Sequence, residues 1–173
     1  MIDAVFTYGR FNPPHLGHKK MIQEIVRLAN EKGKMPVVVV SHSMDVRNPL
    51  SPEEKIAILR KWFPTGVVFM KSSKSEGIIK ISNSVFAPNS IMVVGQNRAE
   101  SFNKVLPTYK KVSINRDESA PSATKARNAA YKNNDETFKQ LTGYKLEPWL
   151  VQRIRNLRNK KLVPRKPKLP KKV

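Results

Sequence analysis

Short apolar runs alternate with amphipathic stretches over most of the chain. Several runs are rich in β-branched residues, and in "MPVVVVS" four valines stand in a row. An uninterrupted apolar run of this kind is typical of a strand that is covered on both faces in a parallel sheet. Five strands are predicted in this way, over residues 2–8, 35–41, 67–70, 90–95 and 111–114.

Helices are predicted between these strands. Apolar residues recur every three or four positions from Leu16 onward, until "NEKGK" ends the pattern. "NPLSPEEKIAILRKWFP" predicts a helix with Ser51 as N-cap, Pro52 in the first turn, Glu54 closing a capping box and Pro64 at the end. Further helices are predicted over residues 76–86 and 98–106 and within "APSATKARNAAYK". This alternation predicts an α/β fold of the Rossmann-like, doubly wound kind, with a parallel five-stranded sheet.

The last sixth of the chain differs in composition. Residues 147–161, "EPWLVQRIRNLRNKK", predict an amphipathic basic helix, and a Pro/Lys-rich tail follows. Residues 145–173 contain eleven basic residues and one acid, a net charge of +10, as much as residues 1–144 with 22 basic and 12 acidic residues. We predict a domain over residues 1–144 and a basic helix and tail over residues 145–173. The predicted apolar stripe is Trp149, Leu150, Ile154 and Leu157, and the candidate polyanion-binding residues are Arg153, Arg155, Arg158, Lys160 and Lys161.

Composition narrows the possible functions. The length of 173 residues fits one domain with an appendage, since domains commonly have about 100 to 200 residues. The absence of cysteine excludes a disulfide framework, thiolate metal sites and a cysteine nucleophile. No apolar run approaches the roughly 18 residues that span a bilayer, and no basic leader is present, so we expect a cytoplasmic protein without a membrane partner. The net charge of +20 predicts attraction to polyanions.

The stretch "YGRFNPPHLGH" joins the first strand to the first helix. A helix N-terminus presents unpaired backbone N–H groups and a partial positive charge to an anion. His15 and His18, three positions apart, can direct both imidazoles to phosphate oxygens as negative charge develops there. Two plainer interpretations stay open: His18 caps the helix while His15 lies on a loop, or both bind a metal with His42.

A second motif, "SATKAR", opens the helix after the fifth predicted strand. Ser122 is a good N-cap, Thr124 lies in the first turn, and Arg127 projects from the same face as Thr124. Hydroxyls, backbone amides and a guanidinium can then converge on one anion. The plain alternative is an ordinary capped helix with a solvated arginine.

Together the two motifs resemble signatures of the nucleotidylyltransferase superfamily. "GRFNPPHLGH" is similar to its His-x-Gly-His phosphate-binding motif, and "SATKAR" resembles the Ser-x-Thr-x-x-Arg motif of its nicotinamide mononucleotide adenylyltransferase branch. The resemblance covers roughly residues 1–140. With "NPLSPEEK" and "ETFKQL", the chain most resembles small nucleotidyltransferase-like proteins of tailed bacteriophages, for which a location in the host cytoplasm or the virion is expected.

The resemblance implies a sheet order of 3-2-1-4-5 and a reaction. An adenylyl group, or a cytidylyl group as in related members, would pass from ATP or CTP to a phosphate-bearing acceptor such as nicotinamide mononucleotide. Pyrophosphate would be released, and Mg²⁺ would be carried by the triphosphate rather than by protein side chains.

The resemblance also implies roles for residues. His15, His18 and Arg127 would be catalytic, with Lys19 or Lys20 as a helper. Relatives commonly have an aspartate where this chain has Asn97. The implied nucleotide-binding residues are Tyr8, Gly9, Phe11, Gly17, Gly95, Asn97, Arg98, Ser122 and Thr124. The acceptor candidates, each of which also fits a plain loop, are His42, Asp45 and Arg47.

The basic C-terminus supports a second hypothesis. A helix and tail this basic suit a protein that binds nucleic acid or a protein assembly. The fold could then serve as a nucleic-acid-binding or structural module, for instance in a virion. The plainest alternative is a solvated charged face that only aids solubility.

Overall fold

The computed structural model describes residues 1–115 and 121–162, with side chains up to Lys160 in the last helix. The predicted C-terminal tail and the side chain of Lys161 lie outside the described residues. The elements along the chain are β1 Ala4–Gly9, α1 Leu16–Lys32, β2 Met35–Val40, α2 Pro52–Trp62, β3 Val68–Lys71, α3 Ile78–Val85, β4 Ile91–Gly95, α4 Ala99–Val105, β5 Lys110–Ile114, α5 Ala123–Tyr131, α6 Asp135–Thr142 and α7 Pro148–Leu162.

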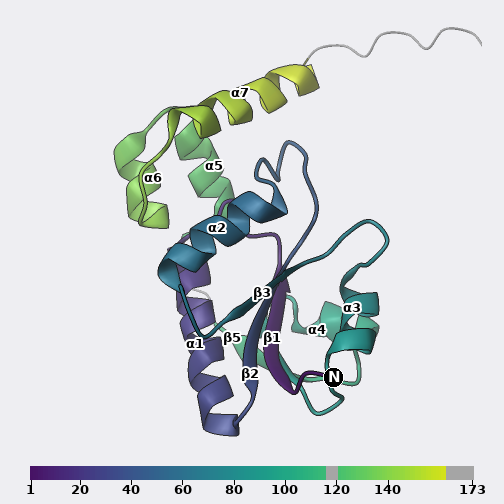
Figure 1. Ribbon diagram of the computed structural model, residues 1–173. Coiled ribbons are helices and arrows are strands. Elements are labelled where there is room, and N and C mark those ends of the chain that lie inside the picture. Colours follow the sequence, from purple (N-terminus) through teal and green to yellow (C-terminus); the bar gives the residue numbers. More distant parts are fainter. Residues whose placement is uncertain (116–120, 163–173) are drawn as a thin grey trace, which may run out of the picture.

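The five strands form one parallel sheet in the order β3-β2-β1-β4-β5 (Figure 1). The predicted strands, their parallel pairing and their order are confirmed. From β1 the chain proceeds outward through β2 and β3 and then returns to place β4 on the other side of β1. The carboxyl ends of β1 and β4 therefore flank the switch point, where open α/β sheets bind their ligands.

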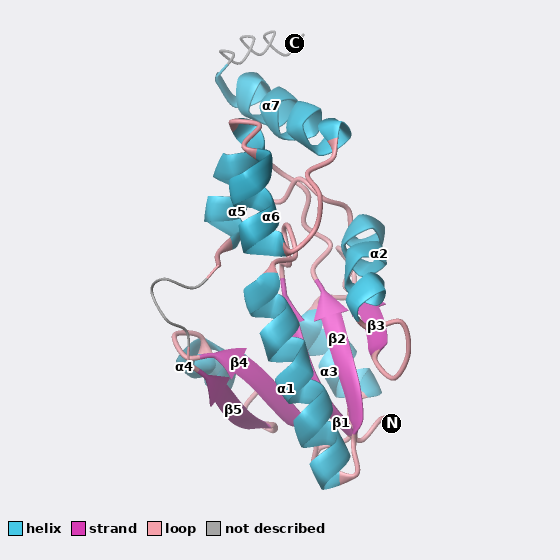
Figure 2. Cartoon of the chain, turned by 90° about the vertical axis from the view of Figure 1, so that its left-hand side faces the viewer, coloured by secondary structure: helices cyan, strands magenta, loops and turns pink. Residues whose placement is uncertain are grey.

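Both faces of the sheet are covered, as the continuous apolar runs predict. On β1, Phe6 packs with Ile81 of α3 on one face. Its neighbour Val5 packs with Ile25 of α1 on the other. Successive strand side chains point to opposite faces, so a strand between two helical layers must be apolar at every position. The view of Figure 2 shows α1 lying across the sheet.

The last three helices form a cluster beyond the carboxyl end of the sheet (Figures 1 and 2). Leu150 and Ile154 of α7 pack in one core with Ala129 of α5 and Phe138 of α6. The helix α6 was not predicted, although it has a local start signal: the Asn134 side chain accepts from the Thr137 N–H. In the described ranges, no helix is long and apolar enough to cross a membrane.

The buried face of α7 differs from the predicted stripe. Leu150 and Ile154 are buried, but Trp149 is 44% exposed and Val151 takes the third buried position. Burial here follows from the side on which α5 and α6 approach, and residues 150, 151 and 154 lie along that side. Periodicity alone could not indicate the direction of approach.

Candidate active site

The loop between β1 and α1 ends in a capping box made by two histidines. His15 is the N-cap of α1, and its Nδ1 accepts a hydrogen bond from the Gly17 N–H at 3.1 Å. In return, the Nδ1 of His18 accepts from the His15 N–H at 3.1 Å. The two rings stack with centroids 3.6 Å apart and an angle of 29° between their planes. The same two imidazoles therefore form both the capping box of α1 and the stacked pair.

These two hydrogen bonds define the tautomer of each ring. A neutral imidazole has one ring proton, and the nitrogen that accepts a hydrogen bond does not carry it. Because Nδ1 accepts in both His15 and His18, Nε2 carries the proton in both rings. Capping uses Nδ1 of both rings, and Nε2–H is the donor group of each neutral ring. The plain interpretation is wrong in its assignment, because His15, 3% exposed, is the N-cap and His18 closes the capping box. Capping through Nδ1 is compatible with phosphate binding.

Gly17 leaves the space that the His15 ring occupies. A Cβ at this position would lie 2.9 Å from Cε1 and 3.0 Å from Nδ1 of His15. The glycine at the third position of the His-x-Gly-His motif therefore has a steric reason, since any side chain there would meet the imidazole.

We expect Gly17→Ala to displace the His15 ring and to weaken nucleotide binding about tenfold, the value of one lost charge-assisted hydrogen bond. Isothermal titration calorimetry with ATP measures this effect. Gln23→Ala, at an exposed position of the same helix, is the control. Equal ATP affinities for the two variants would contradict the steric role of Gly17.

Phe11 supports the histidines from the core side. Its ring is 2% exposed and lies 4.6 Å from the His18 ring, centroid to centroid. Gly9 makes room for it, since a Cβ there would lie 3.0 Å from Cε2 of Phe11. Phe11 has a φ of 48°, in the left-handed region. A buried ring can influence a nucleotide through its contact with His18, which differs from the direct nucleotide-binding role that the resemblance implies for Phe11.

The second motif lies against the first. Ser122 is the N-cap of α5, and its Oγ accepts from the Lys125 N–H at 3.1 Å. Arg127 donates through Nη2 to the Thr124 Oγ1 at 3.2 Å and through Nη1 to the Asn12 carbonyl at 2.8 Å. Asn12 precedes His15 by three residues, so the arginine of one motif holds the loop of the other.

Two buried residues that the sequence analysis missed, Asn12 and Lys55, fix the loop between β1 and α1 by hydrogen bonds. The side chain of Asn12, 1% exposed, donates to the Leu50 carbonyl at 3.0 Å and accepts from the Leu50 N–H at 2.8 Å. Lys55 of α2 is fully buried, and its Nζ donates to the carbonyls of Arg10 at 2.7 Å and Ser41 at 2.6 Å. Burial lowers the pKa of Lys55 to about 8, against a smaller opposing effect of the Glu53 charge.

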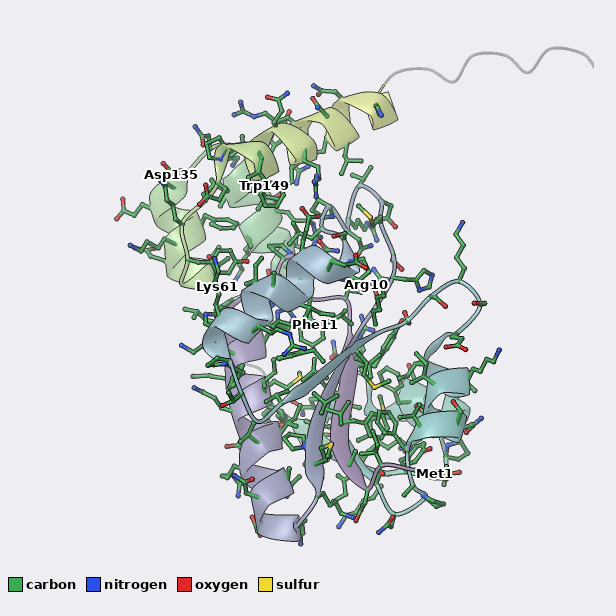
Figure 3. All side chains as sticks on the ribbon, in the orientation of Figure 1. Met1, Arg10, Phe11, Lys61, Asp135 and Trp149 are labelled. Carbon is green, nitrogen blue, oxygen red and sulfur yellow. The ribbon has the colours of Figure 1, made fainter. Side chains whose placement is uncertain are left out.

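Positive charge gathers around the loop. Burial lowers the pKa of Arg127, and the charges of Arg158, Arg47 and Arg10 lower it further, while Asp45 opposes them. An arginine stays charged in such surroundings, so these guanidinium groups repel one another. An anion bound among them would relieve that repulsion. Arg10 and Phe11 lie at the end of β1 in Figure 3.

The acceptor candidates that follow β2 have mostly local contacts. The backbone N–H and the Nδ1 of His42 both lie near the Ser72 Oγ, at 3.0 and 2.9 Å. The Asp45 carboxylate accepts from the backbone N–H groups of Arg47 and Asn48 and so shapes its own turn. These contacts fit the plain loop interpretation of His42 and Asp45, whereas Arg47 adds charge near Arg127.

The turn after β4 lies at the same sheet edge as the histidine loop. Val5 and Phe6 of β1 pair with Ile91 and Met92 of β4, which confirms that the two strands are neighbours. The turn itself holds the other predicted nucleotide-binding residues, Gly95, Asn97 and Arg98. The last two are exposed.

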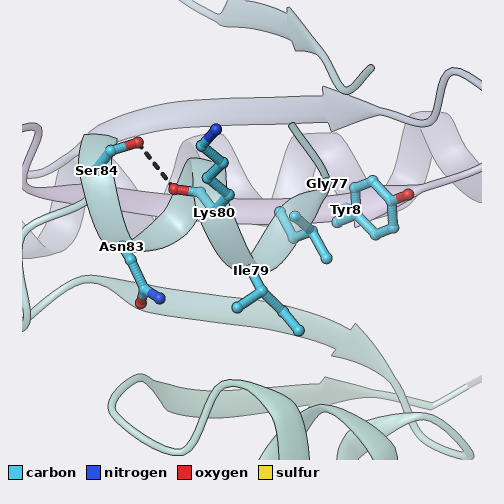
Figure 4. A pocket seen from close by; sticks show the side chains of 7 residues that line it. Tyr8, Gly77, Ile79, Lys80, Asn83 and Ser84 are labelled. Atoms are coloured by element: carbon cyan, nitrogen blue, oxygen red, sulfur yellow. Dashed lines mark hydrogen bonds between the residues drawn. The ribbon is translucent and has the colours of Figure 1, made fainter. Parts of the chain in front are cut away.

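Tyr8 lines a cavity of about 760 Å³ beside the start of α3 (Figure 4). The cavity lies between the carboxyl end of β1 and the helix, with both apolar and polar walls. Its other lining residues are Gly77, Ile78, Ile79, Lys80, Asn83 and Ser84.

In the described part of the chain, no three His, Asp or Glu side chains gather closely enough to hold a metal ion. The donors that converge at the histidine loop are imidazole N–H, guanidinium and backbone amide groups. This set suits phosphate oxygens rather than a bare cation.

The sheet order, the histidine pair after β1 and the arginine bound to the same loop define an α/β protein of the nucleotidylyltransferase class. The family model described as Cytidylyltransferase-like matches residues 6–139. This chain therefore belongs to the Cytidylyltransferase-like family.

Comparison with solved structures shows that the fold occurs in another protein. The crystal structure of a macrolide-efflux protein from Streptococcus pneumoniae is similar, with a TM-score of 0.59 and 17% sequence identity. The match covers 84% of this chain and 56% of that one, so this chain spans little more than half of the solved structure. At this identity the likeness shows the fold alone. No curated protein matches this chain.

Proposed function

We propose that this protein is a nucleotidylyltransferase that transfers an adenylyl group, or alternatively a cytidylyl group, to a phosphate-bearing small molecule such as nicotinamide mononucleotide. The observation that carries the proposal is the stacked pair of His15 and His18 at the start of α1, on a loop that Arg127 binds. Membership of the Cytidylyltransferase-like family supports nucleotidylyl transfer in general.

In the proposed reaction, a phosphate oxygen of the acceptor forms a bond to the α-phosphorus of the triphosphate. The bond from that phosphorus to the bridging oxygen breaks, and pyrophosphate leaves with the electron pair. Both reactants are already ionised, so no protein nucleophile is needed, and the protein acts by alignment and charge stabilisation. His15 and His18 donate to the reacting phosphate, and Arg127 holds the leaving phosphates with Ser122 and Thr124.

Magnesium is proposed to arrive on the triphosphate, where it would offset negative charge on the phosphate oxygens. The cationic donor set described above supports this assignment, because it matches the phosphates and leaves their remaining oxygens for the metal.

The cavity beside Tyr8 is proposed to hold the acceptor. It opens at the carboxyl end of β1, next to the histidine loop, and Lys80 on its wall offers a positive charge to an acceptor phosphate. Ile78 and Ile79 supply apolar contacts for the rest of the molecule.

The proposal is tested by pyrophosphate release from purified protein with Mg²⁺, ATP or CTP, and nicotinamide mononucleotide. Turnover that depends on both substrates is the expected result, and the triphosphate that supports it identifies the transferred group. A series of other phosphate-bearing acceptors follows if nicotinamide mononucleotide is inert.

The second hypothesis, a nucleotidyltransferase fold that serves as a nucleic-acid-binding or structural module, predicts a different result in the same assay. The protein would then bind ATP, measured by calorimetry, but release no pyrophosphate with any acceptor. The basic residues of α7 favour this hypothesis, and the intact histidine pair and Arg127 favour catalysis.

A further inference from the structure

A shallow hollow of about 370 Å³ runs along the side of α7. Successive lining residues are one or three positions apart, so they form a single stripe on the helix. The stripe extends over twelve positions, or about 16 Å at 1.5 Å per residue. It consists of Trp149, Gln152, Arg153, Asn156, Leu157 and Lys160.

Trp149 is an exposed aromatic ring held in a defined place. The side chain is 44% exposed, at the start of α7 (Figure 3). The Arg153 guanidinium lies 4.8 Å from the ring centroid. Arg153 is itself fixed, because it pairs with the Glu54 carboxylate and donates to the Pro49 carbonyl at 3.3 Å. Trp149 is therefore a partly exposed indole with a positioned positive charge over its ring.

The polar residues of the stripe add donors and acceptors. The Gln152 amide donates to the Asn156 Oδ1 at 3.0 Å, which leaves the Gln152 oxygen and the Asn156 nitrogen for other partners. Lys160 adds a second positive charge at the far end of the hollow. The sequence of α7 contains no acid.

The other two predicted polyanion-binding arginines contact α5 and lie outside the stripe. Arg155 donates to the Tyr131 carbonyl at 2.9 Å. Arg158 donates to the Asn128 Oδ1 at 2.9 Å and lies 4.5 Å from the Tyr131 ring centroid. The basic surface of α7 is thus divided between arginines that hold it on α5 and the stripe with Arg153 and Lys160.

We propose that this stripe binds single-stranded nucleic acid, with one unpaired base stacked on Trp149 and backbone phosphates near Arg153 and Lys160. The helix α7 carries basic residues and no acid of its own, although Glu54 of α2 pairs with Arg153, and this net positive charge selects a polyanion. An exposed indole selects a polyanion with accessible base faces. Duplex DNA keeps its base faces stacked, and anionic lipid or heparin has none. The site is separate from the phosphate site, and its proposal does not depend on whether the protein turns over nucleotides.

The test uses the fluorescence of Trp149 in the full chain. The protein has two tryptophans, so Trp62→Phe leaves Trp149 as the reporter. Titration with an oligothymidylate of about 12 nucleotides should quench its emission, because a stacked base contacts the indole. Unchanged emission, or a change only with anionic vesicles or duplex DNA, would overturn the proposal.

Variants separate stacking from charge. Trp149→Ala should weaken oligothymidylate binding at least about fivefold, the lower limit for one stacked base, but leave heparin binding unchanged. Lys160→Gln should weaken the binding of both oligothymidylate and heparin more than Lys104→Gln does. Lys104→Gln is the same charge change at an exposed position of α4. Equal losses for the two lysine variants, or equal effects of Trp149→Ala on both ligands, would contradict the proposed site.

Discussion

Replacement of His18 with asparagine is expected to lower pyrophosphate release at least about a hundredfold while the start of α1 stays intact. The asparagine Oδ1 can take the place of Nδ1 and accept the His15 N–H, but it puts no donor where Nε2 stands. Removal of one donor that stabilises transition-state charge costs about 10²- to 10³-fold in kcat. The measurement is kcat at saturating ATP and acceptor.

Glutamine at the same position is the matched control. Its amide nitrogen can reach toward the position of Nε2, but no acceptor replaces Nδ1. His18→Gln should therefore retain more turnover than His18→Asn and lose about 1 kcal/mol of unfolding free energy, the usual value of a lost N-cap bond. Near-native turnover of the asparagine variant, measured beside urea unfolding, would contradict the assignment of Nε2 as the functional donor.

The second large effect is a pH dependence of stability that comes from Lys55. Its pKa is about 8 in the folded protein, below the ordinary value of 10.5, because burial disfavours the charged form. Between these values the unfolded chain binds more protons than the folded one, so unfolding free energy rises with pH from about 8 to 10.5. The unfolding free energy should rise by about 3 kcal/mol over this range, at 1.36 kcal/mol per pKa unit.

Lys55→Met removes this titration and should flatten the curve. Urea unfolding at pH 7.5 and pH 10 measures the difference between the wild type and the variant. Lys61→Met, on the exposed side of the same helix, should keep the wild-type slope. Parallel pH profiles for the wild type and Lys55→Met would show that Lys55 is not the group responsible.

The main features of the site could be predicted because each motif is local. His15 and His18 stand three positions apart at a helix start, and this spacing alone brings the imidazoles together. Ser122 and Thr124 lie in the first turn of their own helix for the same reason. Their roles in nucleotide binding stay predictions until the measurements above are made.

The supports of the site could not be predicted from spacing. Asn12 bonds to a residue 38 positions away and Lys55 to one 45 positions away. A signal for Lys55 was present, since it lies on the helix face that buries Pro52 and Leu59. Lysine on that face is ordinarily taken as exposed, because a buried ammonium needs carbonyl partners that only the folded chain provides.

The sequence by itself determined the five parallel strands, the helices between them and the caps of α2 and α5, because these depend on local periodicity and on hydrogen bonds within a few residues. Only the tertiary structure decided that Arg127 holds the histidine loop, that α7 buries Val151 rather than Trp149, and which arginines of α7 bind the fold. These contacts join segments far apart in the chain. Their geometry follows from how the elements pack, which no local pattern encodes.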